Sequence, residues 1–84
     1  MQVLFTPRFV RMIGTLPPDL QEEVYEKVEL VQDPKNHPVL KVHKLQGKLK
    51  GIWSFSVNYK TRIVFEITKE GYLLHAVGDH DVYK

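Results

Sequence analysis

Cysteine is absent from this chain of 84 residues. Its absence excludes a disulfide framework, thiolate chemistry and metal binding through sulfur, so nothing argues for a place outside the reducing cytoplasm. Long hydrophobic runs are absent as well, because the apolar stretch at residues 1–5 is far too short for a signal peptide or a membrane span. We therefore expect a cytoplasmic protein without a membrane partner.

Acidic residues are missing from the middle of the sequence. Between Lys35 and Phe65 there are seven lysines and arginines, two histidines and no aspartate or glutamate. Residues 1–33 hold three basic and six acidic side chains, a net charge of −3, whereas residues 34–84 hold nine basic and four acidic ones, a net charge of +5. A one-sided basic field attracts phosphate regardless of base sequence, so this pattern indicates a polyanionic partner such as nucleic acid.

The N-terminal half predicts one short strand and two helices. Strand formers at residues 2–5 are stopped by Thr6 and Pro7, where threonine can cap a helix and proline suits its first position. A brief helix is expected from there to Gly14, and apolar residues at helical spacing predict an amphipathic helix over residues 18–32.

The C-terminal half predicts strands. Three runs have strand character, at residues 52–57, 62–68 and 72–77, and the short turns between them suit an antiparallel meander. Residues 35–51 have no clean period and are expected to be mostly loop, with a short extended piece around residues 39–42. We predict a single α+β domain over residues 1–84, in the order β-α-α-β-β-β. Two N-terminal helices pack on a small, mainly antiparallel sheet, and the first strand lies at an edge or beside a later strand.

Four segments follow one another in a recognisable order. They read His43-Lys44-Leu45-Gln46-Gly47, Gly51-Ile52-Trp53-Ser54, Tyr59-Lys60-Thr61-Arg62-Ile63-Val64-Phe65-Glu66-Ile67 and Val77-Gly78-Asp79-His80-Asp81-Val82-Tyr83. Each is a weak signal alone, but the four together, on a βααβββ scaffold, resemble the RelE/ParE superfamily of bacterial toxins over the whole domain. The resemblance implies a RelE-like fold and the toxin of a type II toxin–antitoxin system, with a cognate antitoxin protein as partner.

The resemblance also implies a target. Most RelE-like members are endoribonucleases that cut mRNA on the ribosome, whereas the ParE branch poisons DNA gyrase. His80, Tyr83 and the basic loop favour the RNA-cleaving branch, with mRNA and the ribosome as partners and no cofactor.

Cleavage of RNA without a metal requires three tasks: removing the 2′-OH proton, stabilising the extra charge on phosphorus, and protonating the leaving 5′ oxygen. Arg62, at the strand arginine of the family, suits the second task as a phosphate clamp. The alternative is an ion pair between Arg62 and Glu66 on a solvated strand face. His80 lies where the family places a histidine or arginine near the C-terminus, and it is the candidate general acid or base. The alternative is a surface histidine in a polar tail.

The general base remains open. Relatives carry lysine, glutamate or histidine on the strand that holds Ser54 and Ser56 here. Lys48 and Lys50 are therefore catalytic candidates, while His43 or a ribosomal group could take the role instead. Taken singly, each lysine is better explained as a solvated loop charge, and the cluster is more informative than any one member.

Aromatic residues interleave with the basic ones, as in proteins that stack on RNA bases. Tyr83, at the family's terminal tyrosine, is the expected base stacker and joins the catalytic set, whereas Trp53 is expected in the core. Five further residues form the predicted RNA-binding set: Lys41, His43, Lys44, Tyr59 and Lys60. His37 and His75 are expected to be structural or incidental, and the spacing of the four histidines predicts no metal site.

Three functions therefore stay open. The first is a ribosome-dependent, metal-independent mRNA endonuclease. The second is a non-catalytic toxin that binds gyrase in the ParE manner or binds only its antitoxin, and the third is a basic RNA-binding module without toxicity. In either toxin case we expect the antitoxin to wrap the helices and the basic face with an acidic or amphipathic helix.

Overall fold

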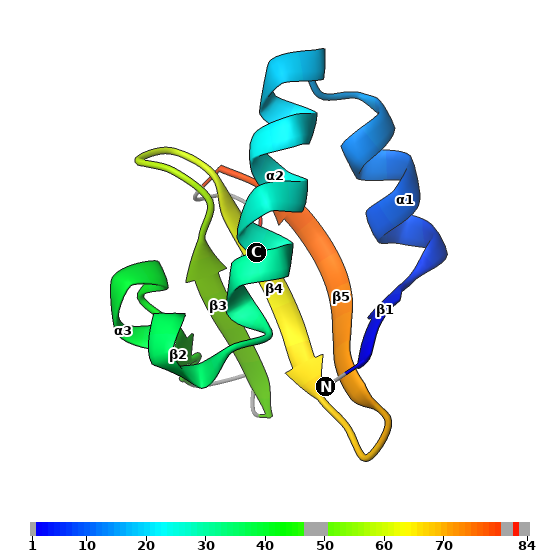
Figure 1. Ribbon diagram of the computed structural model, residues 1–84. Coiled ribbons are helices and arrows are strands. Elements are labelled where there is room, and N and C mark those ends of the chain that lie inside the picture. The colour runs from blue at the N-terminus through cyan, green and yellow to red at the C-terminus, as the bar shows by residue number, and fades with distance from the viewer. Residues whose placement is uncertain (1, 47–50, 80–81, 83–84) are drawn as a thin grey trace.

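The computed structural model describes residues 2–46, 51–79 and 82, and they form one sheet with helices on one side of it (Figure 1). The elements are β1 (Gln2–Phe5), α1 (Pro7–Gly14), α2 (Pro18–Val31), the 3₁₀ turn η1 (Pro34–Asn36), α3 (His37–Leu40), β2 (His43–Lys44), β3 (Ile52–Ser56), β4 (Arg62–Ile67) and β5 (Gly71–Gly78). This confirms the predicted α+β class. None of the described helices is long and apolar enough to cross a membrane.

The sheet has five strands in the order β1-β5-β4-β3-β2. β3, β4 and β5 form the predicted antiparallel meander, and β2 pairs antiparallel with the outer edge of β3. β1 lies parallel to β5, with Gln2 opposite Gly71 and Phe5 opposite Leu74. The N-terminal strand is therefore both an edge strand and the neighbour of the last strand.

The two N-terminal helices begin and end where the sequence indicates. The hydroxyl of Thr6 accepts a hydrogen bond of 3.0 Å from the backbone N–H of Phe9, so it caps α1 as predicted, and Pro7 occupies the first turn. The same hydroxyl lies 3.3 Å from the carbonyl oxygen of His75, which ties the start of α1 to β5. α2 starts at Pro18 and ends at Val31.

The core lies between these helices and one face of the sheet. α1 contributes Phe9 and Ile13, α2 contributes three valines, and the strands contribute alternate residues. Phe65 sits at the centre, with its ring centroid 5.5 Å from that of Phe55 and 5.6 Å from that of Tyr72, both edge-on. Trp53 is only half-buried and packs against the rim of this core, which confirms its expected side of β3.

The prediction for residues 39–42 is wrong. Val39 and Leu40 belong to the helical turn α3, and the extended piece lies later, at β2. Proline in such a segment favours a loop, but Pro38 stands in the first turn of α3, where its missing N–H costs nothing. Leu40 then enters the core at 3% exposure, which holds the turn in place.

Two side chains also tie this segment to α2. Asn36 donates its Nδ2 hydrogen to the carbonyl of Leu30 over 2.8 Å, and Nε2 of His37 lies 2.9 Å from the carbonyl oxygen of Val31. These carbonyls are in the last turn of α2 and have no partner within the helix. His37 is therefore structural, as predicted.

Gly71 is the residue that lets β1 join the sheet. Its φ of +142° is rare for residues with a side chain, and a Cβ there would overlap the backbone carbonyl of Gln2. We predict that Gly71→Ala lowers the free energy of unfolding by at least about 1–3 kcal/mol, since strain and overlap act together. Gly14→Ala is the matched control: a Cβ at that helical position meets nothing within 4 Å.

The measurement is urea unfolding followed by circular dichroism. Gly14→Ala is expected to leave stability unchanged or raise it by up to about 1 kcal/mol. Equal stability of Gly71→Ala and the wild type would contradict the register of β1 against β5.

Candidate nucleic-acid interface

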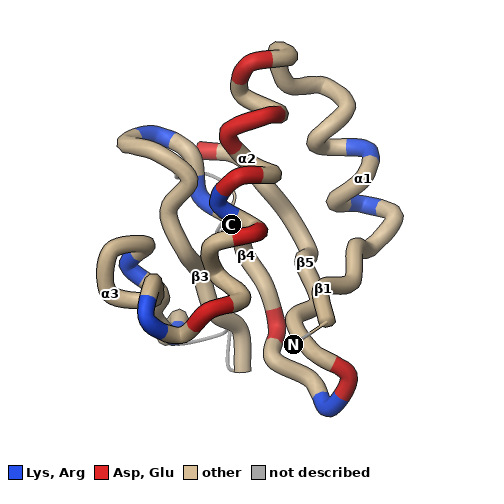
Figure 2. Tube along the Cα trace, in the orientation of Figure 1, with Lys and Arg blue, Asp and Glu red and all other residues tan. Residues whose placement is uncertain are grey.

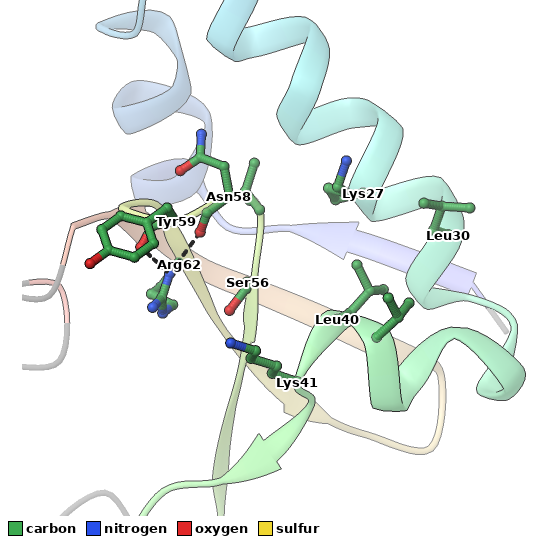
Figure 3. Close-up of a pocket in the computed structure, with 10 residues that line it drawn as sticks. Lys27, Leu30, Leu40, Lys41, Ser56, Asn58, Tyr59 and Arg62 are labelled. Atoms are coloured by element: carbon green, nitrogen blue, oxygen red, sulfur yellow. Dashed lines mark hydrogen bonds between the residues drawn. The ribbon is translucent and has the colours of Figure 1, made fainter.

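Arg62 is the first residue of β4, and its guanidinium group is held by the turn that precedes this strand. Nη1 donates to the carbonyl oxygens of Asn58 at 2.8 Å and Tyr59 at 3.2 Å (Figure 3). It also lies 3.3 Å from the carbonyl oxygen of Thr61, to which it donates. One end of the guanidinium group is thus fixed by the backbone. A guanidinium group carries five N–H groups. Within residues 2–46 and 51–79 only Nη1 has acceptors, so these residues leave the donors on the other nitrogens for a ligand.

Asn58 in turn holds the β3–β4 turn. Its Oδ1 accepts the backbone N–H of Lys60 at 2.9 Å and of Thr61 at 2.8 Å, so it closes the turn locally. Its Nδ2 donates to Oε1 of Glu23 on α2 over 2.6 Å. The position of Arg62 therefore depends on a contact between the turn and a helix on the other layer of the fold.

The alternative ion pair between Arg62 and Glu66 does not form. Oε1 of Glu66 instead lies 3.0 Å from Nε2 of His75 on the neighbouring strand, so His75 has a structural contact, as predicted. Across residues 2–46 and 51–79 no carboxylate forms an ion pair with Arg62. The charge of the guanidinium group is therefore not neutralised by the described part of the chain.

A pocket of about 460 Å³ opens beside Arg62, between the C-terminal half of α2, α3, the end of β3 and the turn (Figure 3). Its lining contains three basic residues and no acidic one: Lys27, Lys41 and Arg62. The remaining lining residues are Leu30, Val39, Leu40, Ser56, Val57, Asn58 and Tyr59. We call this the basic pocket.

Acidic and basic residues gather on different elements of the fold. Figure 2 shows acidic residues along α2 and basic ones on the β3–β4 turn and around α3 and β2. Lys27 is the only basic residue of α2, and its Nζ lies 3.3 Å from Oε1 of Glu26. The polarisation visible in the sequence is thus also a spatial one.

The predicted RNA-binding residues separate into two groups. Lys41 and Tyr59 line the basic pocket with Arg62, and Lys60 is exposed on the same turn as Tyr59. His43 and Lys44 are both exposed on β2 and do not line it, although Nδ1 of His43 lies 2.8 Å from the carbonyl oxygen of Lys41.

Four predicted catalytic residues lie outside the described residues: Lys48, Lys50, His80 and Tyr83. On the sheet face away from α1 and α2, Ser54, Val64 and Ala76 lie in one row across β3, β4 and β5, and all three are buried. In this row, therefore, no titratable side chain is available as a base.

Asn58 and Lys27 are not among the site residues predicted from the sequence. Asn58 falls in a predicted hairpin turn, and asparagine in turns commonly bonds the backbone N–H groups two and three residues on. That signal could have predicted a fixed turn next to Arg62. For Lys27, nothing local in the sequence indicates that it reaches a pocket formed by residues far along the chain.

The hydrogen bond between Asn58 and Glu23 can be tested by substitution. Asn58→Asp keeps the acceptor that closes the turn but removes the Nδ2 donor and sets a second carboxylate beside Glu23. We predict a loss of about 1–3 kcal/mol in the free energy of unfolding. Adding Glu23→Gln restores a donor and should recover most of that loss, as measured by urea unfolding of the two single variants and the double variant. Additive effects would show that the two side chains do not interact.

Comparison with known proteins identifies the fold. No protein-family model matches the chain, and no curated protein sequence matches it. Among solved structures, the toxin–antitoxin complex RelBE2 from Mycobacterium tuberculosis matches with a TM-score of 0.71 and 23% identity, over 94% of this chain and 96% of the matched one. YafQ from E. coli matches with a TM-score of 0.76 and 15% identity, over 98% and 96% of the two chains.

A third match is similar in kind. The YoeB–YefM complex from Staphylococcus aureus has a TM-score of 0.74 and 15% identity, over 95% of this chain and 97% of the matched one. Each match extends over nearly the whole of both chains, so the shared unit is the complete domain. The RelE-like fold implied by the sequence resemblance is confirmed: this chain has the fold of the RelE, YafQ and YoeB toxins.

Proposed function

We propose that the chain is a member of the RelE/ParE superfamily, the toxin of a type II toxin–antitoxin system, and acts in the cytoplasm as a metal-independent endoribonuclease on mRNA at the ribosome. The observation that best supports this proposal is the environment of the Arg62 side chain. Its guanidinium group is fixed at one nitrogen by three backbone carbonyls, has no acidic partner among the described residues, and borders a pocket lined by cations.

The chemistry needs that arrangement. A base takes the proton of the 2′-OH, the 2′ oxygen attacks the adjacent phosphorus, and the bond from phosphorus to the 5′ oxygen breaks as that oxygen accepts a proton. Charge builds on the non-bridging oxygens between these events, and a preorganised guanidinium group stabilises it without having to reorient. We assign this role to Arg62.

The proton-transfer roles are proposed from the sequence. His80 is the candidate acid or base, Lys48 and Lys50 are candidate bases or phosphate ligands, and Tyr83 would stack on a base. A binding-only toxin, directed at gyrase or at the antitoxin alone, is the second candidate. It is favoured by Ser54 and Ser56, since neither serine can act as the base that relatives carry on that strand.

The antitoxin has a candidate docking site on the helical layer. Phe5, Val10 and Tyr25 are 45%, 55% and 51% exposed and line one small cleft between β1, α1 and α2. The ring of Phe5 also stacks on that of Phe9, with 5.4 Å between centroids. Arg8 and Arg11 are exposed and directly precede or follow the lining residues Phe9 and Val10 in α1, so we propose that an amphipathic acidic helix of the antitoxin covers the cleft. The RelBE2 and YoeB–YefM structures are themselves toxin–antitoxin complexes.

The nuclease is tested by brief induction of the wild type, Arg62→Ala and Lys69→Ala at equal abundance. Lys69 is an exposed turn residue away from the basic pocket, so its loss removes the same charge. We predict that primer extension on cellular mRNA shows cuts within translated codons for the wild type and Lys69→Ala, and about a hundredfold or greater loss for Arg62→Ala. Growth arrest without cuts would favour the binding-only toxin. Undiminished cutting by Arg62→Ala would contradict the proposed role of Arg62 as a phosphate clamp.

The docking site is tested separately. Val10→Asp places a carboxylate in the centre of the exposed apolar cleft, where it would be desolvated next to an acidic partner. We predict at least tenfold weaker binding of the cognate antitoxin by calorimetry, which is a change of about 1.4 kcal/mol, together with unchanged mRNA cutting. Unchanged antitoxin affinity would place the docking site elsewhere.

A further inference from the structure

The basic pocket is more apolar than a phosphate site requires. Leu30, Val39 and Tyr59 line it and are 37%, 74% and 91% exposed. None of them is needed by the core, and side chains of this size are not usually left in water together. Their position beside Arg62 and Lys41 indicates a ligand that carries both an apolar face and negative charge.

The strand edge at Ser56 adds directional hydrogen-bonding groups. β2 pairs with β3 only at Ser54 and Trp53, and the backbone N–H of Leu45 donates to the carbonyl of Ile52. The even-numbered residues of β3 therefore present their N–H and C=O toward β2, and in the described part of the chain no strand continues that pairing to Ser56. A donor and an acceptor are thus available at one point in the lining.

The cations lie around this point. Lys41 ends α3 in the left-handed conformation, with φ of 57°, and its side chain points toward Ser56 and Arg62 in Figure 3. Lys27 adds a third positive charge from α2. Its contact with Glu26 joins two neighbouring residues near the surface, and such a pair is weak enough to open for a phosphate.

We propose that the basic pocket binds one unstacked nucleotide of an RNA strand. The base lies between Tyr59 and the wall formed by Leu30 and Val39, with its polar edge at the backbone of Ser56, and its phosphate lies between Lys41 and Arg62. A volume of about 460 Å³ is within the range of small-ligand sites and accommodates one nucleotide. The inference rests on RNA being the ligand of the proposed function. It adds a base-holding subsite at the edge of β3, next to the phosphate clamp.

The subsite gives the toxin a means of choosing where to cut. Arg62 contacts only phosphate and cannot distinguish bases, whereas the hydrogen-bonding groups of Ser56 can. An acidic protein segment would use the same cations, but the open edge of β3 in the lining is the single residue Ser56, which is too short for strand addition. The combination of stacking ring, strand edge and cations therefore favours a nucleotide.

The test is an NMR titration of the ¹⁵N-labelled full chain with adenosine and uridine 5′-monophosphates, with inorganic phosphate as the comparison probe. We expect the nucleotides to shift the amide signals of Val39, Ser56 and Tyr59, and to bind about tenfold or more tightly than phosphate, because base stacking adds to the charge contacts. Tyr59→Ala and Val39→Ser should each weaken nucleotide binding by up to about tenfold and leave phosphate binding unchanged. Ile67→Ser is the matched control, since Ile67 is 44% exposed but lies outside the pocket.

Two results would overturn the subsite. The first is that phosphate perturbs the same amides as strongly as the nucleotides do, which would leave an anion site without a base pocket. The second is that nucleotides shift only signals outside the basic pocket. Neither result depends on cleavage. If Arg62→Ala loses cutting but nucleotides shift no amide signal of the basic pocket, the proposed nuclease stands and the subsite is wrong. If nucleotides bind in the pocket but no cutting is detected, the subsite stands and the proposed nuclease is wrong.

Discussion

The hydrogen bond between Asn58 and Glu23 is the contact on which the proposed site depends. It joins the β3–β4 turn to α2, while the other amide atom of Asn58 closes that turn, whose carbonyls hold Arg62. A flexible arginine would lose side-chain entropy each time it met a phosphate. Here much of that loss occurs on folding, so the guanidinium group is already oriented before the proposed RNA ligand binds.

The same framework separates two surfaces. The helical layer exposes an apolar cleft at Val10 and Tyr25 that suits a protein helix, whereas the β3 edge exposes Tyr59 and Val39 among cations. The acidic α2 lies between them, with Lys27 as its one basic residue at the pocket. An antitoxin bound at the cleft could therefore leave the nucleotide subsite open or extend an acidic segment over it.

Much of the fold could be predicted because its signals are local. Thr6 and Pro7 mark the start of α1, and apolar alternation marks β3, β4 and β5. The error at α3 arose because the evidence for a helix there is tertiary: burial of Leu40 and the bonds that Asn36 and His37 make to the end of α2. The site was predictable only in part for the same reason, since Asn58 and Glu23 are 35 positions apart. Arg62, Lys41 and Tyr59 were found by residue type, but the pocket that unites them depends on packing.

The most direct measurement of the central claim is the side-chain NMR signal of Arg62 during titration with a short 2′-O-methyl RNA, which binds but cannot be cut. If Arg62 is the oriented phosphate clamp, its Nε–H signal is already narrow in the free chain, shifts on RNA addition, and broadens in Asn58→Asp. An Arg62 signal that stays unmoved while RNA binds elsewhere would contradict the clamp and the site built around it.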